Sequence, residues 1–249
     1  MRTIKLTIAY DGTEFVGWQR QENGVSIQGL IETALSEIEG APVTLHGAGR
    51  TDSGVHALGQ VASARITVPI ADAQLMRALN AHLPDAIRVT GVTTEPDGFH
   101  ARFSAIGKAY EYRIWNGPIL PPFARLYAWH IIEPLNVDAM REAARAIPGE
   151  HDFAAFKGSR GINRTTVRTV ASADWLADGE ALTFAIAGSG FLRYMVRSLV
   201  GTLVEIGRGA RPASDVAGLL ASPDRSAAGR TETPHGLFLV RVDYSRMNP

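Results

Sequence analysis

A carboxylate, two hydroxyl side chains and three glycines gather in GAGRTDSGVHA, residues 47–57. Asp52 is the only acidic residue between Glu39 and Asp72. An irregular loop between strands is a frequent position for a catalytic group, which makes Asp52 a candidate. The alternative is a turn aspartate that bonds its own backbone. Phosphoryl transfer is disfavoured because no GxxxxGK[ST] motif and no complete dinucleotide-binding fingerprint is present.

Two arginines interrupt the apolar stretch FLRYMVRSLVGTLVEIG, residues 191–207. Its four-residue spacing predicts a long, largely buried helix over 190–206, with Arg193 and Arg197 in one row. Burying a guanidinium is unfavourable unless an acceptor faces it, so an inward Arg197 requires a partner, for which Asp52 is a candidate. The alternative is an arginine that keeps its stem on the core and its head in water.

Aromatic and basic residues alternate in KAYEYRIW, residues 108–115. In a strand, Tyr110 and Tyr112 share a face with Lys108. An aromatic face beside positive charge suits stacking on a nucleobase, although a tyrosine pair can equally be ordinary core.

Four basic residues fall within twelve positions that contain no acid, namely Lys157, Arg160, Arg164 and Arg168. Glycine, serine and asparagine among them indicate a loop. Such a loop is either a solvated surface or an anion-binding edge, and we favour the second interpretation because arginine makes planar contacts with phosphate.

Length and composition limit the class of protein. The chain has 249 residues, of which 45% are hydrophobic and 20% charged, which is typical of a globular protein. Its 25 basic residues equal its 25 acidic ones, so net charge predicts no partner. Cysteine is absent, which excludes disulfides, cysteine-ligated metals and thiol nucleophiles.

Targeting and metal-binding patterns are not evident either. The first residues alternate in polarity, unlike a signal peptide, and no apolar run is long enough for a membrane helix. The seven histidines show no metal-ligand spacing. We therefore expect a cytoplasmic protein with no membrane association and no metal site.

The elements that must position these residues alternate between strands and helices. Paired strands with helices between them predict an α+β fold with mainly antiparallel sheets, in two halves over 1–104 and 105–249. The expected strands are 3–10, 43–45, 61–66, 87–93, 108–115, 127–132, 166–176, 181–187 and 237–244. The expected helices are 26–40, 72–82, 136–147, 190–206 and one from Pro212.

Taken together, these segments resemble the bacterial tRNA pseudouridine synthases of the TruA type, which isomerise uridines 38, 39 and 40 of the anticodon stem-loop. The resemblance covers nearly the whole chain, and GRTD followed by GVHA is its most specific part. Other matching segments are YDGTEFVGWQRQ (10–21), SIQGLIETAL (26–35), FHARFSAIGKAYEYRI (99–114), HDFAAF (151–156), FLRYMVRSLVGTLVEIG (191–207) and HGLFLVRVDY (235–244). Ser53 stands where the family often has alanine, and Tyr194 lies at a variable position.

The resemblance implies the pseudouridine synthase fold, with two similar halves and an active-site cleft between them. It implies Asp52 as the nucleophile, attacking C1′ of the ribose or C6 of the base, with Arg197 keeping its carboxylate ionised. Tyr110 would pack on the uracil and help remove the C5 proton. Arg50 would hold the flipped-out base, and Leu237 would form an apolar wall.

Partners and cofactors follow from the same resemblance. The expected partners are tRNA and a second copy of the chain, because members of the family form homodimers. No cofactor is expected, since the reaction is redox-neutral and transfers no phosphoryl group. Arginine contacts with the tRNA backbone would offset the cost of unstacking the target uridine.

Two other functions stay open on the residues alone. A non-catalytic tRNA chaperone of the same fold would keep the arginines and tyrosines but would not need Asp52. A hydrolase that uses an aspartate nucleophile on small nucleosides would leave the segment 157–168 without a role.

Overall fold

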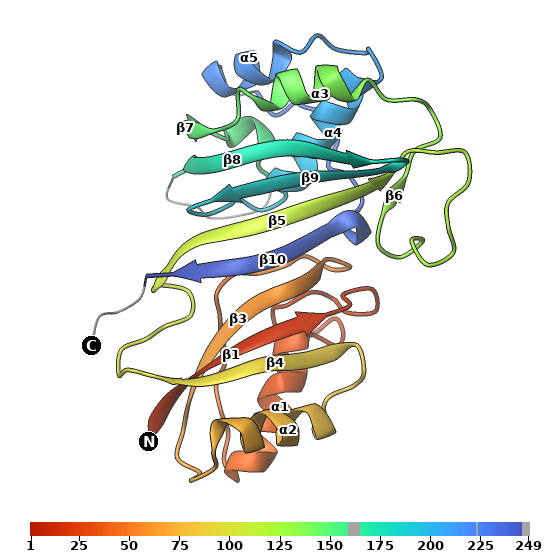
Figure 1. Ribbon diagram of the computed structural model, residues 1–249. Helices are drawn as coiled ribbons and strands as arrows, with labels where there is room; N and C mark the ends of the chain where they lie inside the picture. The colour runs from red at the N-terminus through yellow and green to blue at the C-terminus, as the bar shows by residue number, and fades with distance from the viewer. Residues whose placement is uncertain (159–164, 223, 246–249) are drawn as a thin grey trace. The chain divides into compact units, whose positions relative to one another are not determined.

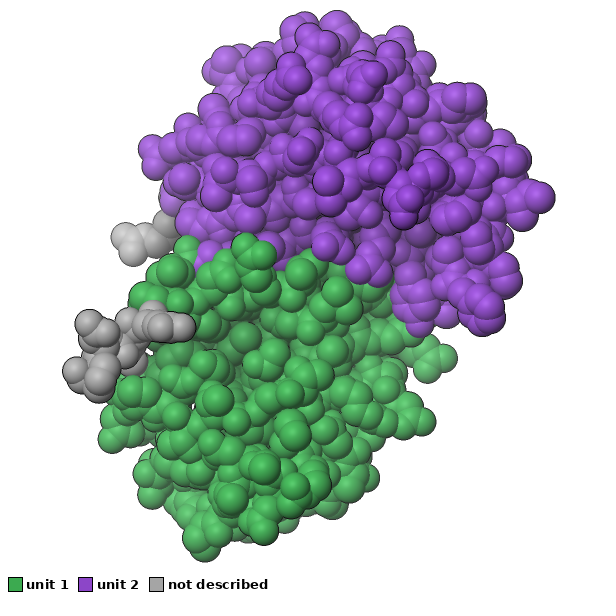
Figure 2. Space-filling model, in the orientation of Figure 1, with its two compact units in different colours: residues 1–106, 238–249 green, residues 107–237 purple. Residues whose placement is uncertain are grey.

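The computed structural model describes residues 1–158, 165–222 and 224–245. The chain divides into two compact units, coloured separately in Figure 2. Unit 1 comprises Met1–Ile106 together with Phe238–Pro249, and unit 2 comprises Gly107–Leu237. The chain therefore leaves unit 1 and returns to it near its C-terminal end.

Unit 1 is a sheet with two helices. Its strands are β1 (Arg2–Tyr10), β2 (His46–Gly47), β3 (His56–Ile66), β4 (Ile87–Glu95) and most of β10 (Leu237–Tyr244), and its helices are α1 (Ile27–Glu39) and α2 (Asp72–His82). The strands lie in the order β4-β1-β3-β10. β1 is antiparallel to both β3 and β4, whereas β10 runs parallel to β3. Figure 1 shows both helices beside these strands.

Local sequence signals account for the elements of unit 1. Alternate residues of β1 from Ile4 to Tyr10 are buried, as their spacing predicts. Helix α1 begins after Ser26, whose hydroxyl accepts a hydrogen bond from the Gly29 amide at 3.2 Å. It ends at Gly40, whose φ of 74° is the left-handed conformation that glycine adopts without penalty.

Unit 2 contains further strands and three α-helices. Its strands are most of β5 (Ala105–Trp115) with β6 (Trp129–His130), β7 (Gly149–Asp152), β8 (Val167–Asp178) and β9 (Ala181–Gly188). Its helices are α3 (Val137–Ala144), α4 (Met195–Gly207), α5 (Asp215–Ala221) and the short 3-10 helices η1 (Ala154–Phe156) and η2 (Pro234–Gly236). The strands pair in the antiparallel order β5-β9-β8-β7. Figure 1 shows α3, α4 and α5 grouped beside β8.

The predicted α+β class with mainly antiparallel strands is confirmed, but several predicted boundaries are wrong. The strand predicted over 127–132 is only Trp129–His130, and the one predicted over 61–66 begins at His56. Residues 43–45 are not a strand, and the short strand is His46–Gly47 instead. Helix 136–147 ends at Ala144. The helix predicted over 190–206 begins only at Met195, because Tyr194 adopts a left-handed conformation that a helix cannot include.

No helix in the described ranges is long and apolar enough to cross a bilayer.

Candidate functional site

The Asp52 loop, residues 47–57, connects β2 to β3 in unit 1 and is the irregular loop that the sequence predicts. The amide of Val55 donates to the Asp52 carbonyl at 3.1 Å, which closes a tight turn. Gly54, at the third position of this turn, has a φ of 75°, where glycine is favoured. Asp52 is partly exposed, and Arg50, two residues earlier in the same loop, is exposed.

Buried side chains of the strands β1 and β3 form hydrogen bonds with the loop. The Tyr10 hydroxyl at the end of β1 lies 2.8 Å from Thr51 Oγ1. Gln60 of β3 donates from Nε2 to the Gly49 carbonyl at 2.9 Å and to the Tyr10 hydroxyl at 3.4 Å. Burial raises the pKa of Tyr10 to about 12 and outweighs the hydrogen bond with Thr51. Tyr10 therefore stays neutral and acts as a fixed hydrogen-bonding support next to Asp52.

Residues 12–18 hold the same loop through its backbone. The Trp18 amide donates to the Thr51 carbonyl at 3.1 Å, and the Ser53 hydroxyl donates to the Phe15 carbonyl at 3.0 Å. Gly17 has a φ of +103°, and a Cβ at this position would lie 2.6 Å from the Thr51 carbonyl oxygen. Only glycine fits so close to the loop.

The imidazole of His56 closes the loop on its C-terminal side. This side chain is 1% exposed, its Nδ1 accepts a hydrogen bond from the Gly12 amide at 3.0 Å, and its ring stacks on Phe238 at 4.6 Å between centroids. The histidine spacing in the sequence gives no sign of this structural role, and the supporting roles of Tyr10 and Gln60 are not evident from the sequence either.

Tyr110 lies in unit 2 on β5 and is 8% exposed. Its ring meets Phe191 edge-on, with 5.0 Å between centroids and 76° between planes. Tyr112, two residues later on the strand, is also buried and donates its hydroxyl hydrogen to the Thr233 carbonyl at 2.8 Å. The predicted strand is confirmed, and Tyr110 and Tyr112 share a face of it.

Arg197 lies in the first turn of α4, half-buried, and its Nε donates to the Glu232 carbonyl oxygen at 2.5 Å. Its guanidinium carbon lies 5.0 Å from the centroid of the Tyr194 ring. The prediction that Arg193 shares a helix face with Arg197 is wrong, because Arg193 precedes the helix and is exposed.

Segment 229–232 fixes the backbone of α4 around Arg197. The Gly229 amide donates to Thr202 Oγ1 at 2.9 Å, and the hydroxyls of Ser198 and Thr231 lie 2.9 Å apart. Small and polar residues at 198, 201 and 202 thus form the helix face that receives this segment. The part of α4 that carries Arg197 is therefore held in place by segment 229–232.

The remaining predicted residues lie in different parts of unit 2. Lys157 follows η1 and is half-buried, as is Arg168 in β8, whose Nη1 donates to the Thr165 carbonyl at 3.1 Å. Leu237 is buried at the start of β10. Arg160 and Arg164 lie outside the described residues.

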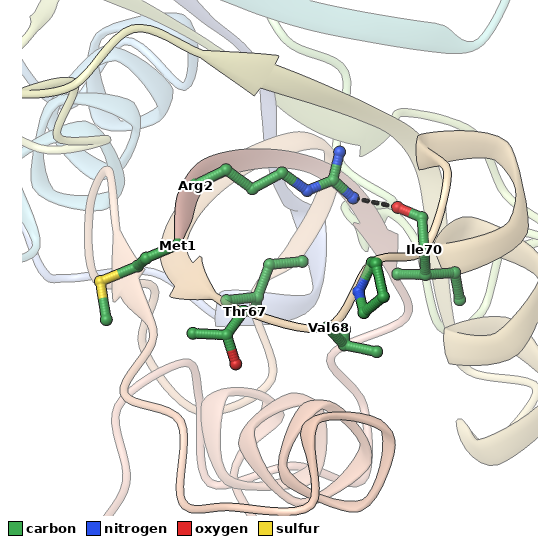
Figure 3. A pocket seen from close by; sticks show the side chains of 7 residues that line it. Met1, Arg2, Thr67, Val68 and Ile70 are labelled. Atoms are coloured by element: carbon green, nitrogen blue, oxygen red, sulfur yellow. Dashed lines mark hydrogen bonds between the residues drawn. The ribbon is translucent and has the colours of Figure 1, made fainter.

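A surface hollow in unit 1 contains none of the predicted residues. It lies between the N-terminal Met1 and Arg2 and the segment 66–70 (Figure 3). The Arg2 guanidinium is held there by the Ile70 carbonyl and, at 2.7 Å, by Asp72 Oδ1. Within the described ranges, no group of three or more His, Asp or Glu side chains is arranged to hold a metal ion.

Comparison with known proteins gives one consistent result. The tRNA pseudouridine synthase family matches residues 6–104 and 143–245, which include Asp52 and Arg197 but not Tyr110. Proteins called tRNA pseudouridine synthase A are 47% identical in Syntrophotalea carbinolica and 46% identical in Geotalea uraniireducens. These alignments cover 98% of this chain, with 97% and 100% of the respective relatives.

A third relative of that name, from Geobacter sulfurreducens, is 47% identical over 98% of this chain and 100% of its own length. Among solved structures, a Cbf5-Nop10-Gar1 complex matches at 13% identity with a TM-score of 0.37, covering 95% of this chain and 48% of that one. A similarity this low adds nothing to the assignment. The family match and these relatives show that the chain belongs to the tRNA pseudouridine synthase family.

Proposed function

We propose that this protein converts uridine to pseudouridine at positions 38, 39 and 40 of the tRNA anticodon stem-loop, with Asp52 as the nucleophile. Membership of the tRNA pseudouridine synthase family is the observation that carries the reaction and the tRNA substrate. The three positions and the residue roles rest on the resemblance of the motifs.

The chemistry requires one carboxylate. The N1–C1′ bond breaks, the uracil turns while bound, C5 joins C1′, and the C5 proton leaves to a base and is replaced by one on N1. Asp52 attacks C1′ or C6 and is released at the end, so no water is consumed. The pair of carboxylates that glycoside hydrolysis uses is not needed. The attack requires an ionised carboxylate, and in this proposal Arg197 keeps Asp52 ionised.

The support around Asp52 suits a nucleophile. Tyr10, Gln60 and Trp18 hold Gly49 and Thr51, just before Asp52, through hydrogen bonds, and Ser53, just after it, bonds the Phe15 carbonyl. Asp52 itself is partly exposed. A reacting group gains most when its position is fixed before the substrate arrives. The loop therefore combines a rigid backbone with an accessible carboxylate.

The other predicted residues receive roles in binding. Tyr110 packs on the uracil and assists removal of the C5 proton, Arg50 holds the flipped-out base, and Leu237 supplies an apolar wall. The basic residues Lys157, Arg160, Arg164 and Arg168 contact the tRNA backbone. Their contacts offset the free energy of unstacking a base, which is about a few kcal/mol.

A homodimer in the cytoplasm completes the proposal. Exposed apolar side chains in the connection from β5 to α3 support a self-association surface. Ile119 is 77% exposed, Phe123 89% and Ile132 63%, and burying such apolar side chains against a second copy of the chain would be favourable. The cytoplasmic location follows from a tRNA substrate. Sedimentation analysis of the wild type and of Phe123→Ser tests the dimer.

The central experiment uses tRNA transcripts labelled with tritium at C5 of uridine. Wild-type protein should release tritium, with products mapped to positions 38–40, and Asp52→Ala should release none while still binding tRNA. Asp97→Ala, which changes an exposed acid in the same unit, is the matched control and should retain full activity. Release by Asp52→Ala at the wild-type rate would refute the assignment of the nucleophile.

A further inference from the structure

Tyr194 has a backbone conformation that is unusual for its side chain. Its φ is 66° and its ψ is 0°, and within the described ranges every other residue with positive φ is a glycine. An aromatic residue is disfavoured in the left-handed region, where glycine and asparagine are accommodated more easily. Something in the fold must hold Tyr194 there, and a conformation of this kind often marks a functional position.

Two arginines lie against the Tyr194 ring. The guanidinium carbon of Arg193 is 4.6 Å from the ring centroid and that of Arg197 is 5.0 Å from it. Both distances are within the range of cation–π attraction. Arg193 also donates from Nη2 to the Tyr194 hydroxyl at 2.7 Å. Arg193 therefore holds the ring through its hydroxyl, and the π face of the ring lies within cation–π distance of Arg197.

Gly158 packs closely against the same ring. A Cβ at this position would lie 2.3 Å from Tyr194 Cδ2, so only a glycine leaves room for the ring. The Gly158 amide also donates to the Arg193 carbonyl at 3.0 Å. Gly158 directly follows Lys157, so the beginning of the basic segment rests on Tyr194. The Gly158 backbone therefore limits the space that the ring can occupy.

We infer that Tyr194 is a positioning residue for Arg197, an inference that rests on the proposed function of Arg197. The left-handed backbone turns the ring toward the first turn of α4, where it meets the Arg197 guanidinium. Arg197 is then held at two points, by the Tyr194 ring and by the Glu232 carbonyl that accepts from Nε. A guanidinium held this way keeps its Nη groups in one direction, which orients a carboxylate partner before substrate binds.

The test compares Tyr194→Phe with Tyr194→Leu, using tritium release from tRNA. Phenylalanine keeps the aromatic face and loses only the hydroxyl, so kcat should stay within about twofold of the wild type. Leucine is close in bulk but has no π system, so kcat should fall roughly tenfold with KM nearly unchanged. Equal kcat for the leucine variant and the wild type, equal impairment of both variants, or a loss confined to KM would overturn the inference.

A second variant reaches the ring without altering Tyr194. Gly158→Ala adds a methyl group 2.3 Å from Tyr194 Cδ2, so the ring must shift from its present position against Arg197, and kcat should fall as it does for Tyr194→Leu. Thermal unfolding of each variant checks that the fold is retained. Tyr194→Gly should unfold at a higher temperature than Tyr194→Ala, by about 2–4 °C, because both lack the ring and only alanine is strained. The opposite order would contradict the left-handed conformation.

Arg197→Ala separates this inference from the proposed function. If the wild type releases no tritium, or Arg197→Ala is as active as the wild type, the proposed function of Arg197 fails. If Arg197→Ala is impaired and Tyr194→Leu is not, only the positioning role of Tyr194 fails.

Discussion

Removing one hydroxyl group beneath the Asp52 loop should affect both stability and turnover. Tyr10→Phe deletes the oxygen that lies 2.8 Å from Thr51 Oγ1 and 3.4 Å from Gln60 Nε2, in a side chain that is 4% exposed. Thr51 is itself 7% exposed, so water does not readily replace the lost bond. Leaving a buried polar group unsatisfied costs about 1–3 kcal/mol of unfolding free energy. At this chain length, that lowers the melting temperature by roughly 2–12 °C.

Turnover should fall because Thr51 directly precedes the proposed nucleophile. A loss of about 1.4 kcal/mol in transition-state stabilisation corresponds to a tenfold lower kcat, and we expect an effect of that order. The assay is urea unfolding together with steady-state tritium release. Tyr244→Phe is the matched control, since it deletes a hydroxyl of the same unit that donates to the Ala101 carbonyl at 2.7 Å and not to the loop residues Gly49 and Thr51 that Tyr10 and Gln60 hold. Equal kcat for Tyr10→Phe and this control would refute the reasoning.

Three further substitutions test other parts of the structure. Gly17→Ala should lower the free energy of unfolding by about 2 kcal/mol or more, measured in urea, because its Cβ would meet the Thr51 carbonyl and its φ is +103°. Ser26→Ala removes the cap that accepts from the Gly29 amide, and should cost about 1 kcal/mol in the same assay without changing kcat. Burial lowers the pKa of His235, so its neutral form favours folding above pH 6.5, and this stability is lost as the pH falls through the lowered pKa. His235→Gln should therefore lose less stability than the wild type between pH 7.5 and 5.5, and an equal loss would contradict this.

Elements with local signals could be predicted from the sequence. The alternation of β1 and the capping of α1 by Ser26 and Gly40 each depend on residues close together in the chain, and the structure confirms them. The loop that carries Asp52 could be found in the same way, because glycines and hydroxyl residues cluster there. Its chemical role came only from the resemblance.

Features that depend on distant contacts could not be predicted. The apolar periodicity continues through Tyr194, so the local sequence does not indicate that α4 begins only after this residue. Tyr194 instead packs against Gly158, which is far away in the chain. The support of the Asp52 loop is similar, since Tyr10 and Thr51 are separated by 41 positions. Tyr10 is apolar enough to be assigned to the core, and its hydroxyl partner becomes visible only in the folded chain.

The return of the chain to unit 1 has a consequence for biosynthesis. Phe238 and Leu239 of β10 pair with His56 and Ala57 at the start of β3, beside the Asp52 loop. During translation the edge of β3 at these residues has no β10 to pair with until Gly107–Leu237 has been made. At ordinary elongation rates that interval is on the order of 10 s, long enough for an unpaired strand edge to meet another chain. The nascent N-terminal unit should therefore be a chaperone substrate. In a chain stalled on the ribosome before residue 238, the Asp52 loop should lack its neighbouring strand β10.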